Sequence, residues 1–117
     1  MKKVANRYAV ALFELALEEA KLDEYAQQLS FLRKVFEDQE VLAFLTALKI
    51  QAKVKKELIK NILDKQVNRH LVSFIMILID KRRISLVKVI IDEFHSLVNQ
   101  HYNIEEGIVY SIRPLSD

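Results

Sequence analysis

The sequence contains no cysteine, one glycine and one proline among its 117 residues. Without cysteine the chain has neither disulfide bonds nor thiol chemistry, which fits a reducing compartment. All-β folds need many turn residues, so the shortage of glycine and proline predicts long helices. The chain also has no large excess of charge of either sign, because 18 basic and 16 acidic residues leave a net charge of only +2. That balance does not by itself indicate a nucleic-acid partner.

Long hydrophobic runs are missing as well. A membrane-spanning helix needs about 20 apolar residues, and the longest uncharged run, at 71–79, is far shorter. The start of the chain, MKK followed by AVALFELAL, has the order of a signal peptide. However, Arg7 and Glu14 interrupt its apolar part and no small-residue cleavage site follows. We therefore expect neither a membrane span nor a secretory signal.

Apolar residues recur at helical spacing through most of the chain. The pattern predicts six helices, within residues 4–20, 23–37, 40–48, 49–65, 68–81 and 85–102. Asp23 fits an N-cap or a first-turn acid of the second helix, and Ser85 fits the cap of the sixth. The broad core face expected for the sixth helix consists of Leu86, Val89, Ile90, Ile91, Phe94, Leu97 and Val98. We expect an all-α fold, a six-helix bundle that forms one domain over residues 1–104.

The fourth predicted helix is rich in lysine. Its apolar positions expected to face inward are Val54, Leu58 and either Ile62 or Leu63. Its lysines expected mostly on the outer side are Lys53, Lys55, Lys56 and Lys60. Such a group can touch nucleic acid or acidic lipid, but Glu57 and Asp64 interleave with it. We therefore favour a solvated helix face.

Residues 105–117, EEGIVYSIRPLSD, hold the only glycine and the only proline. Ile108, Tyr110 and Ile112 alternate with other residues as in a strand, and PLSD resembles the start of another helix. A lone strand has nothing to pair with. We therefore expect a short strand-like tail that is either a linker into a second domain, cut short here, or disordered.

Residues that carry chemistry are scarce. The three histidines, His70, His95 and His101, have no spacing typical of metal ligands. No glycine-rich loop and no serine or cysteine nucleophile motif is present. The pair Glu105 and Glu106 fits a solvated acidic turn better than a catalytic pair. We expect no catalytic residue, no metal and no cofactor.

The fifth predicted helix contains six consecutive apolar residues, FIMILI, at 74–79. On a helix they divide into two stripes. The first stripe is Leu71, Phe74, Ile75 and Leu78, and the second is Val72, Met76, Ile79 and Arg83. Ile77 belongs to neither. The bundle can bury the first stripe. The second is either buried too, or open beside the spare face of the first helix, where both would form a groove for an amphipathic helix. Met76 would adapt to such a partner.

Two segments, ANRYAVALFELALEEAKLDEY at 5–25 and SFIMILIDKRR at 73–83, resemble the delta subunit family of bacterial F-type ATP synthases. The mitochondrial relative of that family is the oligomycin-sensitivity-conferring protein. The residues that match its pattern are Arg7, Tyr8, Ala9, Leu12, Phe13, Ala16, Leu22, Asp23, Phe74, Leu78, Asp80 and Arg83. GIVYSIRPLS looks like the link into the family's second domain, so the resemblance covers the N-terminal domain. One departure is Arg82, where the family often has glycine, and this weakens the prediction of a left-handed turn.

The resemblance implies a stator subunit without catalytic activity, attached to the cytoplasmic face of the bacterial plasma membrane only through its complex. It implies a bundle that binds the N-terminal helix of an alpha subunit between helices one and five, and a missing second domain that joins the b subunit of the peripheral stalk. The groove residues expected are Val4, Tyr8, Ala11, Leu12, Leu15, Val72, Met76, Ile79 and Arg83. The apolar arc of the helix at 4–20 is so wide that the sequence does not show which of its residues face the groove and which face the core. The alternative is a helical nucleic-acid-binding module that uses the lysines of the fourth helix.

Overall fold

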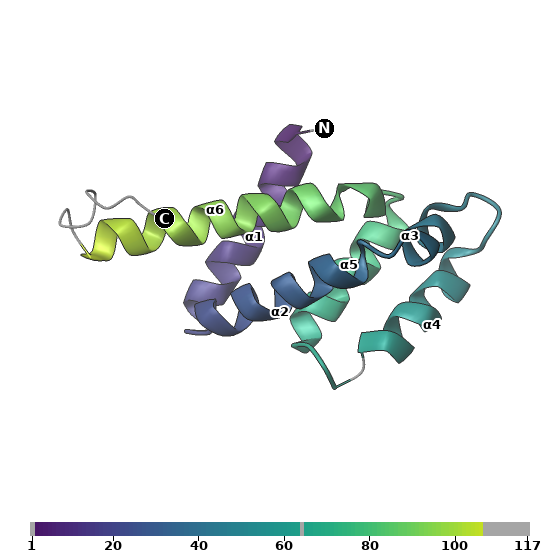
Figure 1. Cartoon of the computed structure of the whole chain (residues 1–117), viewed down its shortest axis with the longest axis horizontal. Helices are drawn as coiled ribbons and strands as arrows, with labels where there is room; N and C mark the ends of the chain where they lie inside the picture. The colour runs from purple at the N-terminus through teal and green to yellow at the C-terminus, as the bar shows by residue number, and fades with distance from the viewer. Residues whose placement is uncertain (1, 64, 107–117) are drawn as a thin grey trace.

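The computed structural model of the chain describes residues 2–63 and 65–106 (Figure 1). Its helices are α1 (Lys2–Glu18), α2 (Leu22–Val35), α3 (Gln39–Thr46), α4 (Ala52–Leu63), α5 (Arg69–Asp80), the 3-10 turn η1 (Ile84–Leu86) and α6 (Val87–Glu106). Within the described residues there is no strand. The prediction of an all-α, six-helix bundle is therefore confirmed. The strand-like tail was predicted for 105–117. Its first two residues are helical instead, because α6 continues to Glu106, so the expected acidic turn there is wrong. The rest of the predicted tail, 107–117, lies outside the described residues.

The long helix α6 crosses α1 and also packs against α2 (Figure 1). Ala5, Ala9 and Ala16 on α1 are completely buried. Because alanine has so small a side chain, the buried side of α1 can lie close to its neighbours. On the other side of the bundle α4 packs against α5, and α3 contacts η1. The core runs through all of these elements as one cluster.

The inner faces of the helices agree only partly with the predictions. The first stripe of α5 is buried as expected, at Leu71, Phe74, Ile75 and Leu78. On α4 the buried line is Lys55, Ile59 and Leu63. The inward placement of Val54 is wrong, since this residue is 43% exposed. The true face is turned by one residue because the alkyl stem of Lys55 packs inward like an apolar side chain.

The start of α6 also differs from the prediction. Ser85 is not the cap of this helix, because it lies inside η1. Val89 is 42% exposed and is not part of the core face. The predicted core residues Ile90, Ile91 and Phe94 are completely buried, as expected.

Two helices end in a left-handed residue although the described part of the chain contains no glycine. Ala20 has a φ of 57° and Arg82 a φ of 58°. After α1, the N–H of Lys21 donates to Ala16 O at 2.9 Å, and after α5 the N–H of Arg83 donates to Leu78 O at 2.7 Å. These are the hydrogen bonds of a Schellman motif. The left-handed turn at Arg82 is therefore present in spite of the missing glycine.

Polar contacts tie α2 to its neighbours. Arg33 on α2 donates to Asp92 on α6, with Nε to Oδ1 at 2.8 Å and Nη2 to Oδ2 at 3.1 Å. This guanidinium holds the pKa of the Asp92 carboxyl below its usual value. The buried Tyr25 hydroxyl donates to Glu19 Oε1 at 2.9 Å, and Glu19 Oε2 lies 2.9 Å from His70 Nδ1. α2 is thereby linked to α6, to the end of α1 and to the start of α5.

Replacing Ala20 by glycine will stabilise the bundle. An L-residue in the left-handed region costs about 1 kcal/mol, and glycine avoids that strain. The matched control is Ala11→Gly within α1, which will destabilise by about 1 kcal/mol because glycine is a poor helix former. Urea denaturation followed by circular dichroism measures both. A lower unfolding free energy for Ala20→Gly than for wild type would contradict the assigned helix end.

The pair between Arg33 and Asp92 predicts a pH dependence. Asp92→Asn will lower the unfolding free energy at pH 7 by about 0.5 kcal/mol, since the pair is exposed and screened by water. A carboxyl with a lowered folded-state pKa stabilises above its unfolded pKa, and this stabilisation is lost as the pH falls through the folded value. The difference will therefore begin to shrink below about pH 4 and will vanish only below the lowered folded-state pKa of Asp92. Glu14→Gln on the exposed side of α1 is the control. An equal loss of unfolding free energy in this control would contradict a stabilising pair between Arg33 and Asp92.

Candidate partner-binding groove

One side of α1 carries apolar residues that the bundle leaves partly open. These residues are Val4, Tyr8, Ala11 and Leu15, which repeat at helical spacing, and each is half-buried or exposed. Leu12, also predicted for this side, is only 6% exposed and belongs to the core. The structure thus divides the wide apolar arc of α1 into a core face and an open strip, which periodicity alone did not.

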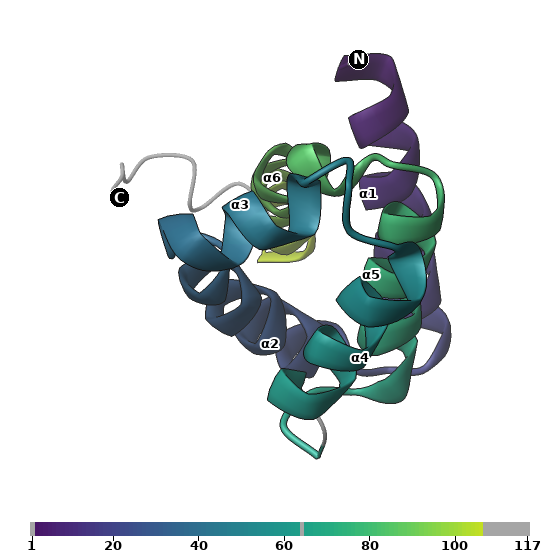
Figure 2. The same cartoon turned by 90° about the vertical axis from the view of Figure 1, so that its right-hand side faces the viewer.

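Tyr8 joins α1 to α5. Its ring lies 6.1 Å from the ring of Phe74, centroid to centroid, with 59° between the planes. Arg83, in the turn after α5, donates from Nη1 to the Tyr8 hydroxyl at 3.2 Å. In Figure 2 both helices lie on the same side of the molecule. Two of the predicted groove residues, Tyr8 and Arg83, are therefore brought into direct contact.

Met76 and Ile79, the middle of the second stripe of α5, lie on the side of this helix that faces α4. Met76 lies beside Lys53, Lys56 and Lys60 of α4 in a shallow hollow. Next to it, Lys56 Nζ forms an ion pair with Asp80 Oδ1 at 2.8 Å.

The expectation that this stripe is open is therefore met only in part. Val72 and Met76 are half-buried. Ile79 is 4% exposed, so its expected exposure is wrong and it is a core residue. The physical reason is that α4 packs on this side of α5 and covers it.

Ile77 is the residue that sequence reasoning left without a role. It is 45% exposed and follows Phe74 by about one helical turn. Residues three apart lie on the same side of a helix, so Ile77 lies next to the edge of α5 that Tyr8 contacts. Its signal in the sequence was its position outside both stripes, near Ser73 and Asp80, where a polar residue is the usual choice. Exposed or half-buried apolar residues are therefore present on both helices of the junction, Ile77 on α5 and the open strip on α1.

The lysines of α4 do not form one exposed patch. The side chain of Lys55 is buried, with 9% exposure, and Lys56 is paired with Asp80. Lys53 and Lys60 remain exposed. The expected outward position of Lys55 is wrong because that residue lies on the inner line of the helix. This arrangement weakens the alternative of a nucleic-acid-binding face.

The part of the chain that the structure describes offers neither a metal site nor a membrane span. No group of three or more histidine, aspartate or glutamate side chains is placed to hold a metal ion there. None of the described helices is both long enough and apolar enough to cross a membrane.

Comparison with known proteins gives one consistent result. The family model of the ATP synthase delta (OSCP) subunit matches residues 4–117. ATP synthase subunit delta of Halalkalibacterium halodurans is 37% identical over 115 residues, and those of Bacillus velezensis and Bacillus subtilis are 38% and 37% identical. Each alignment covers 97% of this chain and 63% of the relative. The chain therefore spans somewhat less than two thirds of the length of these relatives.

Aspartate substitutions at a buried and at an exposed position of α5 will lower the unfolding free energy by different amounts. Ile79→Asp places a carboxylate in the core and will lower the unfolding free energy by more than about 3 kcal/mol. Ile77→Asp changes an exposed position and will cost no more than about 1 kcal/mol. Urea denaturation of both variants gives the two values. A similar loss in both would show that Ile77 is covered by the bundle and would contradict the assigned open surface.

Proposed function

This chain belongs to the ATP synthase delta (OSCP) subunit family, and from that premise we propose that it is part of the stator of an F-type ATP synthase. In this role its bundle sits on the catalytic head of the complex and performs no chemistry. Its groove between α1 and α5 binds the N-terminal helix of an alpha subunit. The observation that carries the proposal is the exposed apolar surface at Ile77 beside the Tyr8–Phe74 junction.

The surface fits an amphipathic helix. Such a helix recognises a groove by inserting apolar residues spaced one turn apart. The strip of Val4, Tyr8, Ala11 and Leu15 extends over three turns of α1, which gives a partner helix room for several anchors. Covering one large apolar side chain contributes about 1.5–3 kcal/mol. Several such contacts are enough for a stable helix–groove complex.

The geometry at Tyr8 supports a preformed site. Its ring packs on Phe74, and its hydroxyl accepts a hydrogen bond from Arg83. Both contacts hold the aromatic side chain in one orientation before a partner arrives. An anchor that is already fixed loses little conformational entropy on binding. Small Ala11, one turn further along α1, leaves space for the backbone of the partner helix.

A stator link needs rigidity more than chemistry. The rotor of the synthase exerts torque on the catalytic head, and the stator must resist it. A bundle with one continuous buried core responds to force as a single body. The link to the b subunit of the peripheral stalk is proposed for the part of the family's length that this chain does not span. Peripheral attachment at the cytoplasmic face of the bacterial plasma membrane follows from that assembly.

The test is binding of a synthetic peptide with the sequence of the alpha-subunit N-terminal segment, measured by isothermal titration calorimetry. Wild-type protein will bind the peptide. Ile77→Asp will weaken binding at least about tenfold, because a tenfold loss corresponds to only 1.4 kcal/mol and the substitution removes an apolar contact and buries a charge. Tyr8→Phe keeps the ring but loses the contact with Arg83, and will weaken binding less.

Two folded controls make the test specific. Val89→Asp changes an equally exposed apolar residue on α6, and Met76→Asp changes the side of α5 that faces α4. Both will bind the peptide with wild-type affinity. If Met76→Asp abolishes binding while Ile77→Asp does not, the partner helix lies on the α4 side and the groove is misplaced. If wild-type protein binds no alpha peptide, the proposed partner is wrong.

A further inference from the structure

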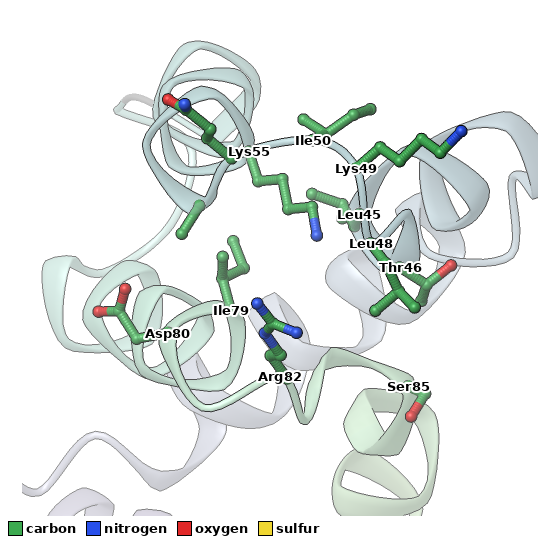
Figure 3. A pocket seen from close by; sticks show the side chains of 12 residues that line it. Leu45, Thr46, Leu48, Lys49, Ile50, Lys55, Ile79, Asp80, Arg82 and Ser85 are labelled. Atoms are coloured by element: carbon green, nitrogen blue, oxygen red, sulfur yellow. The ribbon is translucent and has the colours of Figure 1, made fainter.

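Away from the proposed α1–α5 groove, the largely buried side chain of Lys55 reaches into a cavity. The segment between α3 and α4, the start of α4 and the end of α5 enclose a cavity of about 420 Å³. Leu45 and Ile79 form part of its apolar wall. Figure 3 shows Lys55 and Arg82 directed into this cavity, Lys55 from α4 and Arg82 from the turn after α5.

Lys55 is the unusual group in this cavity. Its side chain is 9% exposed, and among the described residues it forms no hydrogen bond or ion pair. Lysine is almost never buried to this degree unless it is paired. The cost of removing an ammonium group from water is recovered only when an opposite charge or good acceptors lie beside it. The carboxylate on the cavity rim, Asp80, is already engaged by Lys56 at 2.8 Å.

Two further features add positive potential beside Lys55. Arg82 brings a guanidinium, which matches the geometry of phosphate oxygens. Gln51 and Ala52 also line the cavity, so the N-terminal end of α4, with its positive dipole, lies beside it. Helix N-termini of this kind are common phosphate sites.

We propose that this cavity is an anion site that binds a phosphate group. Lys55 and Arg82 hold the phosphate from opposite sides, and the first turn of α4 faces it. A carboxylate is the weaker match, because two full positive charges and a helix N-terminus converge where a carboxylate brings one negative charge. The phosphate is either free inorganic phosphate or the terminal group of a nucleotide. In the second case the exposed Leu48 and neighbouring Ile50 offer an apolar surface to the rest of the molecule.

The left-handed residue of the α5 end takes part in this arrangement. Arg82 has a φ of 58°, and from this backbone position its side chain enters the cavity (Figure 3). Glycine would fit the backbone better but has no side chain to offer. Arginine at this position is consistent with a ligand that uses its charge.

The experiment uses the full chain labelled with nitrogen-15. Inorganic phosphate replaces chloride at constant ionic strength while amide shifts are recorded. We expect saturable shifts that centre on Gln51–Lys55 and Arg82. Lys55→Met will reduce the phosphate affinity at least about tenfold, since it removes a charge-assisted contact. Lys60→Met, on the exposed side of the same helix, will leave the affinity unchanged.

Melting temperature provides an independent readout. In phosphate-free buffer Lys55→Met will melt at a higher temperature than wild type, because it removes a buried unpaired charge. Phosphate will raise the melting temperature of wild type and leave that of Lys55→Met unchanged. Arg82→Gln serves if Lys55→Met does not fold, and it will also lose affinity at least about tenfold. Equal phosphate binding by wild type and either of these variants overturns the site, as do shifts that do not saturate or that spread over all lysines.

A titration with adenosine diphosphate in place of inorganic phosphate shows whether the site binds free phosphate or the terminal phosphate of a nucleotide. Tighter binding than inorganic phosphate, with shifts extending to Leu48 and Ile50, identifies a nucleotide. Equal or weaker binding identifies free phosphate. Because the cavity and the α1–α5 groove use different residues, loss of phosphate binding leaves the alpha peptide result unaffected, and each proposal fails independently.

Discussion

The contact of Tyr8 with Phe74 and Arg83 holds together the two helices that flank the proposed groove. The ring packs across the gap between α1 and α5, and the hydroxyl ties α1 to the turn that ends α5. Because Phe74 is buried and Arg83 follows a left-handed residue, both partners of Tyr8 are fixed by the backbone around them. The shape of the proposed groove therefore depends on this junction.

α5 is in contact with neighbours on most of its circumference, which explains its almost continuous apolar sequence. One side enters the core, and the side with Met76 and Ile79 lies against α4. Ile77 is left exposed between α4 and the edge that meets α1. Exposed apolar residues occur elsewhere on the bundle as well, for example Val89 on α6, so the exposure of Ile77 alone does not indicate a partner. Its position next to the edge of α5 that Tyr8 contacts is what makes it the candidate contact.

Much of this could be predicted from the sequence, and the errors have a common origin. The spacing of apolar residues predicted six helices, and the matching residues predicted Tyr8 and Arg83 at one site. Periodicity measures how wide an apolar face is, but it does not say which neighbour covers each edge. For that reason Ile79 was expected to be open although α4 covers it, and Ile77 was left without a role although it is exposed. On α4 the same limit misplaced Lys55, whose long alkyl stem packs inward while the pattern counts it as polar.

The central claim is that a helix from the alpha subunit lies on α1 and α5 at Ile77 and Tyr8. Intermolecular nuclear Overhauser effects between the labelled bundle and the alpha N-terminal peptide test it most directly. The account predicts contacts from the peptide to the methyl groups of Ile77 and the ring of Tyr8, and none to the methyl group of Met76. Contacts at Met76 or Leu48, with none at Ile77, would contradict it.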